Sequence, residues 1–160
     1  MIVVSDTTPL SSLIHINRFN LLKELFRFVI IPSEVAAEIN SMPVLASVIK
    51  ANSSWINIAE VINKMKKEEL MVVLDEGESA AIILAIERKA DLILIDERKG
   101  KKIAGEYGFH TTGTLGILLQ AKHRGLIKEL KPDLLQLKYT YNFWMTDQLI
   151  TQMLILAGEV

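Results

Sequence analysis

The sequence of 160 residues predicts an α/β fold, a three-layer α/β/α sandwich with a mainly parallel central sheet. Short apolar runs rich in β-branched residues alternate with longer stretches that have helical periodicity. The clearest of these runs, IVVS, FVII and LILI, are almost entirely apolar, as strands of a parallel sheet are when helices cover both of its faces. The chain has no internal repeat and no flexible linker, so we expect a single domain over residues 1–160.

Five segments are expected to form the strands of this sheet. The first, IVVS, is short and β-branched, and the fourth, LILI, is the clearest strand in the chain. The last, FHTT, has the fewest apolar residues of the five. The expected strands are residues 2–5, 28–31, 56–61, 92–95 and 109–112.

Helices are expected between the strands, and several of their start signals are visible. Thr8 and Pro9 are typical of an N-cap and a first helical residue. Asp75 and Glu78 have the spacing of a capping box ahead of a strongly apolar helix. A C-terminal amphipathic helix is expected to pack on the domain or on another copy of the chain. The expected helices are residues 8–14, 19–26, 33–39, 43–52, 64–70, 75–90, 98–106, 115–124 and about 144–158.

Composition excludes several classes of protein. Half of the residues are hydrophobic and 23% are charged, which excludes a disordered chain. No apolar run reaches the roughly 18 to 20 residues of a membrane span, and the N-terminus lacks the features of a secretory signal. We therefore expect a cytoplasmic protein without membrane contact. The absence of cysteine excludes disulfides, Cys-ligated zinc and a thiol nucleophile.

The net charge of −1 gives the chain no general attraction to nucleic acid, so any polyanion site must be local. Basic residues are concentrated after the fourth expected strand, where Arg98, Lys99, Lys101 and Lys102 lie in one run that could also be a solvated helix face. The three histidines are scattered without the spacing of metal ligands.

Acidic residues follow two of the expected strands directly. Asp6 follows the first strand and Asp96 follows the fourth. Ligands of open parallel sheets bind outside the carboxyl ends of the strands. If these two strands are parallel neighbours, both carboxylates lie on the same rim of the sheet. Glu38 and Glu78 lie on helices that begin near that rim, so four carboxylates are expected to converge.

Such a cluster requires a cation. Two like charges ~4 Å apart repel by about 4 kcal/mol at an effective dielectric constant of 20. An all-oxygen cluster suits Mg²⁺ or Mn²⁺ better than zinc. The basic run Arg98, Lys99 and Lys102 begins at the same rim, where it is expected to hold phosphate groups of a substrate.

Each acidic residue also has a structural interpretation. Asp96 could cap the helix that starts after it, and Glu78 could be only the third helical residue of its capping box. Glu38 could be a solvent-facing helix residue, and Asp6 could be a cap. The joint pattern favours a shared site.

The sequence resembles the PIN-domain family, metal-dependent ribonucleases that include the VapC toxins of prokaryotic toxin–antitoxin pairs. More narrowly, it resembles an uncharacterised PIN-like branch. The stretches that carry the resemblance run in the expected order and cover most of the chain. They are VSDTTPL at 4–10, IPSEVAAEI at 31–39, LDEGESAAIILA at 74–85, LILIDERKGKKIA at 92–104 and GTLGILLQAKHRGLI at 113–127.

The resemblance implies an endoribonuclease that hydrolyses RNA phosphodiester bonds with one or two Mg²⁺ or Mn²⁺ ions. It implies that Asp6, Glu38, Glu78 and Asp96 are the catalytic metal ligands. Thr8 would support the first aspartate or its metal. Frequent homodimers are implied, and for toxin members an antitoxin protein as partner.

This sequence departs from the family pattern in two places. Glu78 is longer than the aspartate of many toxins, and Lys-Gly-Lys-Lys at 99–102 replaces the usual neighbourhood of the last acid. The main alternative is a catalytically inactive PIN-like scaffold that binds RNA or a partner protein. A receiver-type signalling domain would need paired acids after the first strand and a lysine after the last. A haloacid-dehalogenase-type phosphatase would need an acid at the position of Thr8.

Overall fold

The computed structural model describes all 160 residues and contains a five-stranded sheet with the order β3-β2-β1-β4-β5. All four strand pairs are parallel. The α/β sandwich expected from the sequence is therefore confirmed. The strands are β1 (Val3–Ser5), β2 (Val29–Pro32), β3 (Ile56–Ala59), β4 (Leu92–Leu94) and β5 (His110–Thr112).

The central strand β1 pairs with a different part of the chain on each side. Val4 is in register with Ile30 of β2 and with Ile93 of β4. The chain builds outward from β1 to β3 and then returns to place β4 on the other side of β1. The carboxyl ends of β1 and β4 therefore form the topological switch point, where open α/β sheets bind their ligands.

Ten helices connect and flank the strands. They are α1 (Thr7–His15), α2 (Asn20–Phe26), α3 (Ser33–Asn40), α4 (Pro43–Ala51), α5 (Lys64–Leu70), α6 (Glu76–Arg88), α7 (Arg98–Glu106), α8 (Thr114–His123), α9 (Lys131–Tyr139) and α10 (Asp147–Leu156). The sequence did not predict α9. The start signal was present, because Pro132 occupies one of the first helical positions. None of these helices is long and apolar enough to cross a membrane.

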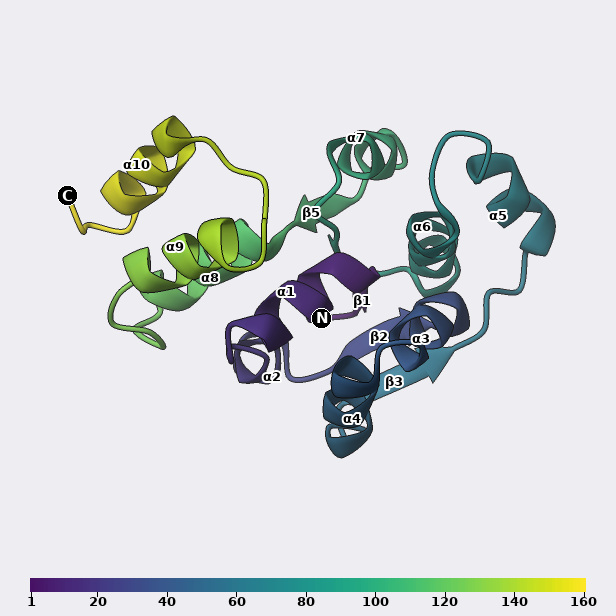
Figure 1. The fold of residues 1–160 in the computed structure, drawn as a ribbon. Coiled ribbons are helices and arrows are strands. Elements are labelled where there is room, and N and C mark those ends of the chain that lie inside the picture. Colours follow the sequence, from purple (N-terminus) through teal and green to yellow (C-terminus); the bar gives the residue numbers. More distant parts are fainter.

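Two apolar clusters pack on opposite faces of the sheet. The larger contains Val3 and Leu94 together with residues of α1 to α4 and α8 to α10. The smaller contains Val4 and Ile93 together with residues of α5, α6 and α7. Neighbouring strand residues thus point to opposite faces, as the pleat requires. Figure 1 shows the result, with α8 to α10 on one side of the strands and α5 and α6 on the other.

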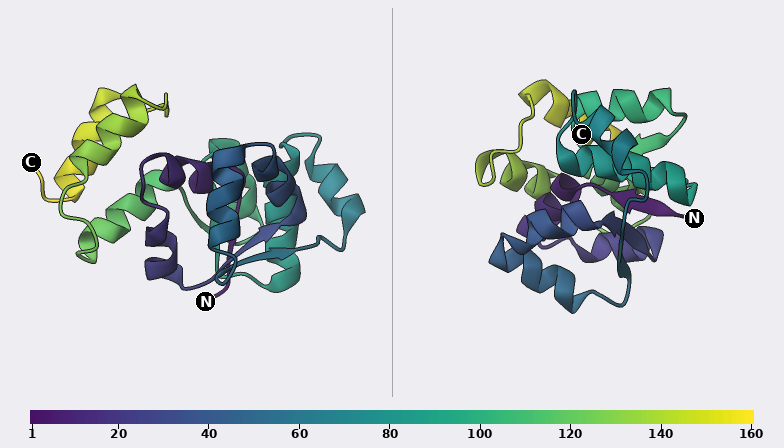
Figure 2. Two further views of the ribbon diagram at one scale, coloured as in Figure 1. Left: turned by 60° about the horizontal axis from the view of Figure 1, so that its bottom comes forward. Right: turned by 90° about the vertical axis from the view of Figure 1, so that its right-hand side faces the viewer.

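The C-terminal helices α9 and α10 extend beyond the sheet. Figure 2 shows them as a separate arm at one end of the molecule, with the C-terminus at its tip. They are joined to the rest by the larger apolar cluster, to which Leu137 and Met153 contribute. The arm therefore has a packed attachment to the body.

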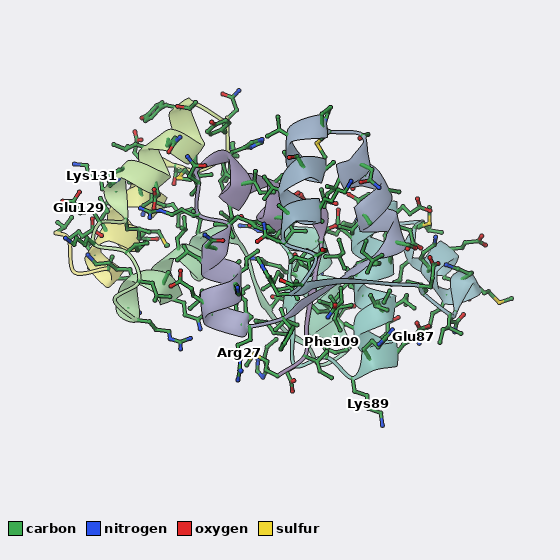
Figure 3. All side chains as sticks on the ribbon, turned by 90° about the horizontal axis from the view of Figure 1, so that it is seen from below. Arg27, Glu87, Lys89, Phe109, Glu129 and Lys131 are labelled. Carbon is green, nitrogen blue, oxygen red and sulfur yellow. The ribbon has the colours of Figure 1, made fainter.

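The two rims of the sheet carry different groups. Arg27, Lys89 and Phe109 lie near the amino ends of β2, β4 and β5, and Figure 3 shows all three on one margin of the molecule. Because the strands are parallel, their carboxyl ends all lie at the opposite rim. That rim carries the acidic residues.

Candidate active site

Asp6 lies directly after β1 and is fixed by the neighbouring strand. Its N–H donates to the carbonyl oxygen of Leu94 at 2.9 Å. Helix α1 begins at Thr7, so Asp6 occupies the N-cap position with extended backbone and makes no side-chain capping bond. The prediction that Thr8 is the N-cap is therefore wrong. The Asp6 side chain is left free of capping, although only 5% of the residue is exposed.

Thr7, rather than Thr8, contacts a second acid of the site. Its Oγ1 donates to Glu38 Oε2 at 2.8 Å and so orients this exposed glutamate of α3. A Cβ atom added to Gly77 would lie 2.9 Å from Asp6 Oδ1 and 3.4 Å from Glu38 Oε2. The two carboxylates therefore approach the same point on the first turn of α6, and any side chain at position 77 would press on Asp6.

Glu78 lies in the first turn of α6, as the capping box predicted. Its N–H donates to Asp75 Oδ1 at 2.8 Å, which confirms Asp75 as the N-cap. The Glu78 side chain does not return a bond to the Asp75 backbone. Instead its Oε2 is buried and has no hydrogen-bond partner. A Cβ at Gly100 would lie 2.9 Å from this oxygen, so glycine again makes room for a carboxylate.

Asp96 follows β4 by two residues and is held by the start of α8. The backbone N–H and the hydroxyl of Thr114 donate to its two carboxylate oxygens, each at 2.7 Å. Helix α7 has Glu97 at its N-cap position and gains no side-chain capping bond. The structural interpretation, in which Asp96 caps the helix that follows it, is therefore wrong. Asp96 is oriented by a helix that begins 18 residues later.

A cleft of about 790 Å³ brings together side chains from both sides of the switch point. Asp6, Glu78 and Asp96 line it, whereas Glu38 does not. Thr8 also lines the cleft. Its other acidic lining residues are Asp75 and Glu97. Five acidic side chains thus line the cleft at the carboxyl ends of β1 and β4.

Two cations of α7 lie at the cleft, and only one of them was expected there. Arg98 lines it, but Lys99 and Lys102 are exposed and do not. Lys101 lines the cleft instead, and its Nζ lies 3.2 Å from where a Gly113 Cβ would be. Lys101 also acts on Asp96, whose pKa its charge lowers.

The environment raises the pKa values of the buried acids. Burial raises the pKa of Asp6 to about 7, and the carboxylates of Asp75 and Glu38 add to the effect. Burial also raises the pKa of Glu78 to about 8, and Asp75 again contributes. The pKa of Asp96 is raised by burial, although the hydrogen bonds from Thr114 oppose this. Asp6 and Glu78 therefore keep their protons to higher pH than ordinary carboxylic acids do, because burial disfavours their charged forms.

The donors of this cluster suit a hard divalent cation. They are carboxylate oxygens, and the buried Glu78 Oε2 lacks the partner that a buried polar atom normally has. The structure shows no group of three acidic, histidine or cysteine side chains already arranged to hold a metal ion. A bound ion would therefore require the carboxylates to move closer together.

Several residues that line the cleft or hold its acids in place were not predicted from the sequence as part of a site. Asp75 was interpreted only as a cap, and Lys101 was one of several adjacent cations. Thr7 and Thr114 gave no signal beyond being hydroxyl residues beside a predicted helix start. The pattern Asp-Thr-Thr at 6–8 was the one available clue for Thr7.

Comparison with known proteins supplies a family. A protein-family model described as PIN domain matches residues 2–159 of the chain. This match confirms the family resemblance carried by the five stretches. No protein of curated function matches the chain.

Proposed function

Because the chain belongs to the PIN-domain family, we propose that it is an Mg²⁺- or Mn²⁺-dependent endoribonuclease. PIN domains are generally nucleases, and PIN nucleases usually use divalent metals. The observation that carries the proposal is the orphaned Glu78 Oε2, buried in a cleft that Asp6 and Asp96 also line. A buried carboxylate oxygen without a partner is costly unless a ligand satisfies it.

In this proposal Asp6, Glu78 and Asp96 hold the metal. Glu38, whose carboxylate approaches Asp6 at Gly77, supports the site from beside it. A bound divalent ion would supply an activated water molecule and stabilise negative charge on the phosphate. Thr114 fixes the Asp96 carboxylate through hydrogen bonds to both of its oxygens, and Thr7 fixes Glu38 through one.

The proposed reaction is hydrolysis of an RNA phosphodiester bond. The oxygen of water bonds to phosphorus, and a ribose oxygen leaves and takes up a proton. Arg98 and Lys101 lie at the same cleft, where their charges can neutralise phosphates next to the one that reacts. This local positive charge offsets the lack of any general attraction between the chain and RNA.

A test is the incubation of the protein with single-stranded RNA and Mn²⁺. We expect cleavage that EDTA abolishes and that Asp6→Asn reduces by roughly 100-fold or more, the scale on which loss of one transition-state contact acts. Glu68→Gln is the matched control, because Glu68 is an exposed acid of α5 outside the cleft. Absence of EDTA-sensitive cleavage, or full activity of Asp6→Asn, would refute the proposal.

The inactive scaffold is the second candidate, and one observation favours it. No three ligands stand ready for a metal ion. A scaffold would bind RNA without cleaving it, so the same assay separates the two functions. The toxin role and the homodimer are finer proposals that rest on family resemblance. A neighbouring gene for a small antitoxin protein would support the toxin role, and a lone gene would count against it.

A further inference from the structure

The end of the cleft away from the acids is aromatic. The connection between α9 and α10 contributes Tyr141, Phe143 and Trp144 to the cleft lining. Figure 1 shows this connection running back from the C-terminal arm toward α1. Trp144 is 82% exposed and Tyr141 is 39% exposed. Large aromatic side chains left open at a cleft are typical of a binding surface.

One of these aromatic side chains is held in place by α1. The rings of Tyr141 and His15 are stacked, with centroids 4.6 Å apart and planes 8° from parallel. His15 is the last residue of α1 and also lines the cleft. The stack therefore fixes the connection against the same helix whose other end adjoins Asp6.

Helix α1 links the aromatic end to the acidic end by a polar stripe. Thr8, Ser11, Ser12 and His15 all line the cleft and have the i, i+3, i+4, i+7 spacing of one face of the helix. From Thr8 to His15 this face extends ~10 Å, at about 1.5 Å per residue. Hydroxyl groups along such a stripe can contact the phosphates and ribose hydroxyls of a nucleic acid strand.

We propose that the aromatic end, formed by Trp144 and by Tyr141 on His15, is a subsite that stacks an unpaired base of the RNA substrate. The proposal rests on the proposed function, because it places this base along the strand from the phosphate that is cleaved. Aromatic stacking requires a base whose face is free, and bases within a duplex are already stacked on each other. Because every base has such a face, the subsite selects single-stranded RNA with little regard to sequence.

The first test uses the emission of Trp144. The chain has two tryptophans, and Trp55 is buried with 3% exposure. In the variant Trp55→Phe, Trp144 is the only tryptophan, and excitation selective for tryptophan reports on it alone. The Asp6→Asn substitution is added so that RNA stays intact. We expect single-stranded RNA to quench this emission at saturation, and duplex RNA of the same sequence to quench it far less. If Trp55→Phe does not fold, the same signal is the difference between Asp6→Asn and Asp6→Asn with Trp144→Phe.

The second test measures affinity for single-stranded RNA by fluorescence anisotropy in the Asp6→Asn protein. Trp144→Ala should weaken binding ~5- to 150-fold, the effect of losing one base–aromatic stack. Trp144→Phe should restore most of the affinity because it keeps an aromatic face. Tyr139→Ala is the matched control, since Tyr139 is 67% exposed just before the same connection but does not line the cleft.

The outcomes separate this subsite from the proposed function. RNA binding without a change in Trp144 emission, or with unchanged affinity in Trp144→Ala, overturns the subsite and leaves cleavage intact. Emission that depends on protein concentration without RNA also overturns it, because Trp144 would then contact a second copy. Failure of the Asp6→Asn protein to bind RNA that the wild type cleaves overturns the subsite alone, whereas absence of both binding and EDTA-sensitive cleavage overturns the nuclease as well.

Discussion

Two acidic clusters lie on the same pair of helices, yet only one of them contains a cation. Glu34 of α3 and Glu76 of α6 are joined by Lys67 of α5, whose Nζ lies 2.9 Å and 3.1 Å from their carboxylates. Glu38 lies one helical turn beyond Glu34, and Glu78 lies two residues beyond Glu76. These two acids have no ion pair with any lysine or arginine.

The pKa values of the two clusters reflect this difference. Burial alone would raise the pKa of Glu34, but the Lys67 ammonium outweighs it and holds that pKa below its ordinary value. Burial raises the pKa values of Asp6 and Glu78 to about 7 and about 8, with no cation to oppose it. The fold thus neutralises the acids that join its helices. Lys101 partly offsets the charge of Asp96, but Asp6 and Glu78 are left for a cation from outside the chain.

The largest expected effect is a pH dependence of the free energy of unfolding that comes from Asp6, an acid without a neighbouring cation. In EDTA, the folded state keeps the Asp6 proton up to about pH 7, whereas an unfolded chain releases it near 3.8. The folded state therefore binds more protons in this window, and the free energy of unfolding falls as pH rises. From pH 5 to pH 8 Asp6 alone should contribute a loss of about 3 kcal/mol.

Urea unfolding at several pH values would measure this loss. Asp6→Asn removes the titrating group, so its free energy of unfolding should fall less over the same interval. Glu68→Gln should follow the wild-type curve, since Glu68 is exposed. Parallel curves for wild type and Asp6→Asn would show that Asp6 titrates normally in the folded protein.

The second prediction breaks the neutralised cluster. Lys67→Met keeps the length of the side chain but leaves Glu34, whose side chain is 9% exposed, without its closest cation. Loss of one partner of a buried ion pair is strongly destabilising. Lys64 lies 3.9 Å from Glu34 and Glu76 is half exposed, which reduces the effect. We expect a loss of about 2 kcal/mol in the free energy of unfolding.

Lys64→Met is the matched control for this substitution. Lys64 is 52% exposed and contacts the same glutamate at longer range. Exposed pairs contribute at most ~1 kcal/mol, so its loss should be small. Equal destabilisation by the two variants would mean that burial of Lys67 does not matter.

The sequence predicted the architecture well because parallel strands leave a direct mark. IVVS is apolar except for Ser5 and LILI is apolar throughout, and each is followed directly by an acid. The pairing of these strands was stated as a condition, because nothing local determines which strands are neighbours. The structure supplies this pairing, with Ser5 in register with Leu94.

The cations of the site could not be predicted individually. Arg98 and Lys101 are three residues apart and share one face of α7, while Lys99 and Lys102 share the next. Which face meets the cleft depends on how α7 packs on the sheet. The buried residues Gly100 and Ala104 determine that packing, and small residues gave no strong apolar signal.

The aromatic end of the cleft and α9 were missed for a related reason. Helix α9 has only a weak difference between its faces, since Asp133 is buried beside Leu134 and Leu137. Arg18 pairs with this aspartate at 3.0 Å, across 115 residues of sequence. A contact over that distance in the chain has no local sequence signature.

The smallest expected effect is a loss of cleavage activity when the space beside the Asp6 carboxylate is filled. In Gly77→Ala the new methyl group would lie 2.9 Å from Asp6 Oδ1, so this carboxylate must shift by a few tenths of an ångström. Because catalytic geometry is sensitive to such displacements, we expect roughly a tenfold loss in kcat/KM for RNA cleavage. Gly105→Ala is the control, since nothing lies within 4 Å of the new atom in α7. It should leave cleavage unchanged and stabilise the fold by about 0.5–1 kcal/mol, because alanine favours helix. Unimpaired cleavage in Gly77→Ala would show that the position of Asp6 against α6 does not limit the reaction, and Asp96 and Glu78 would then carry the site.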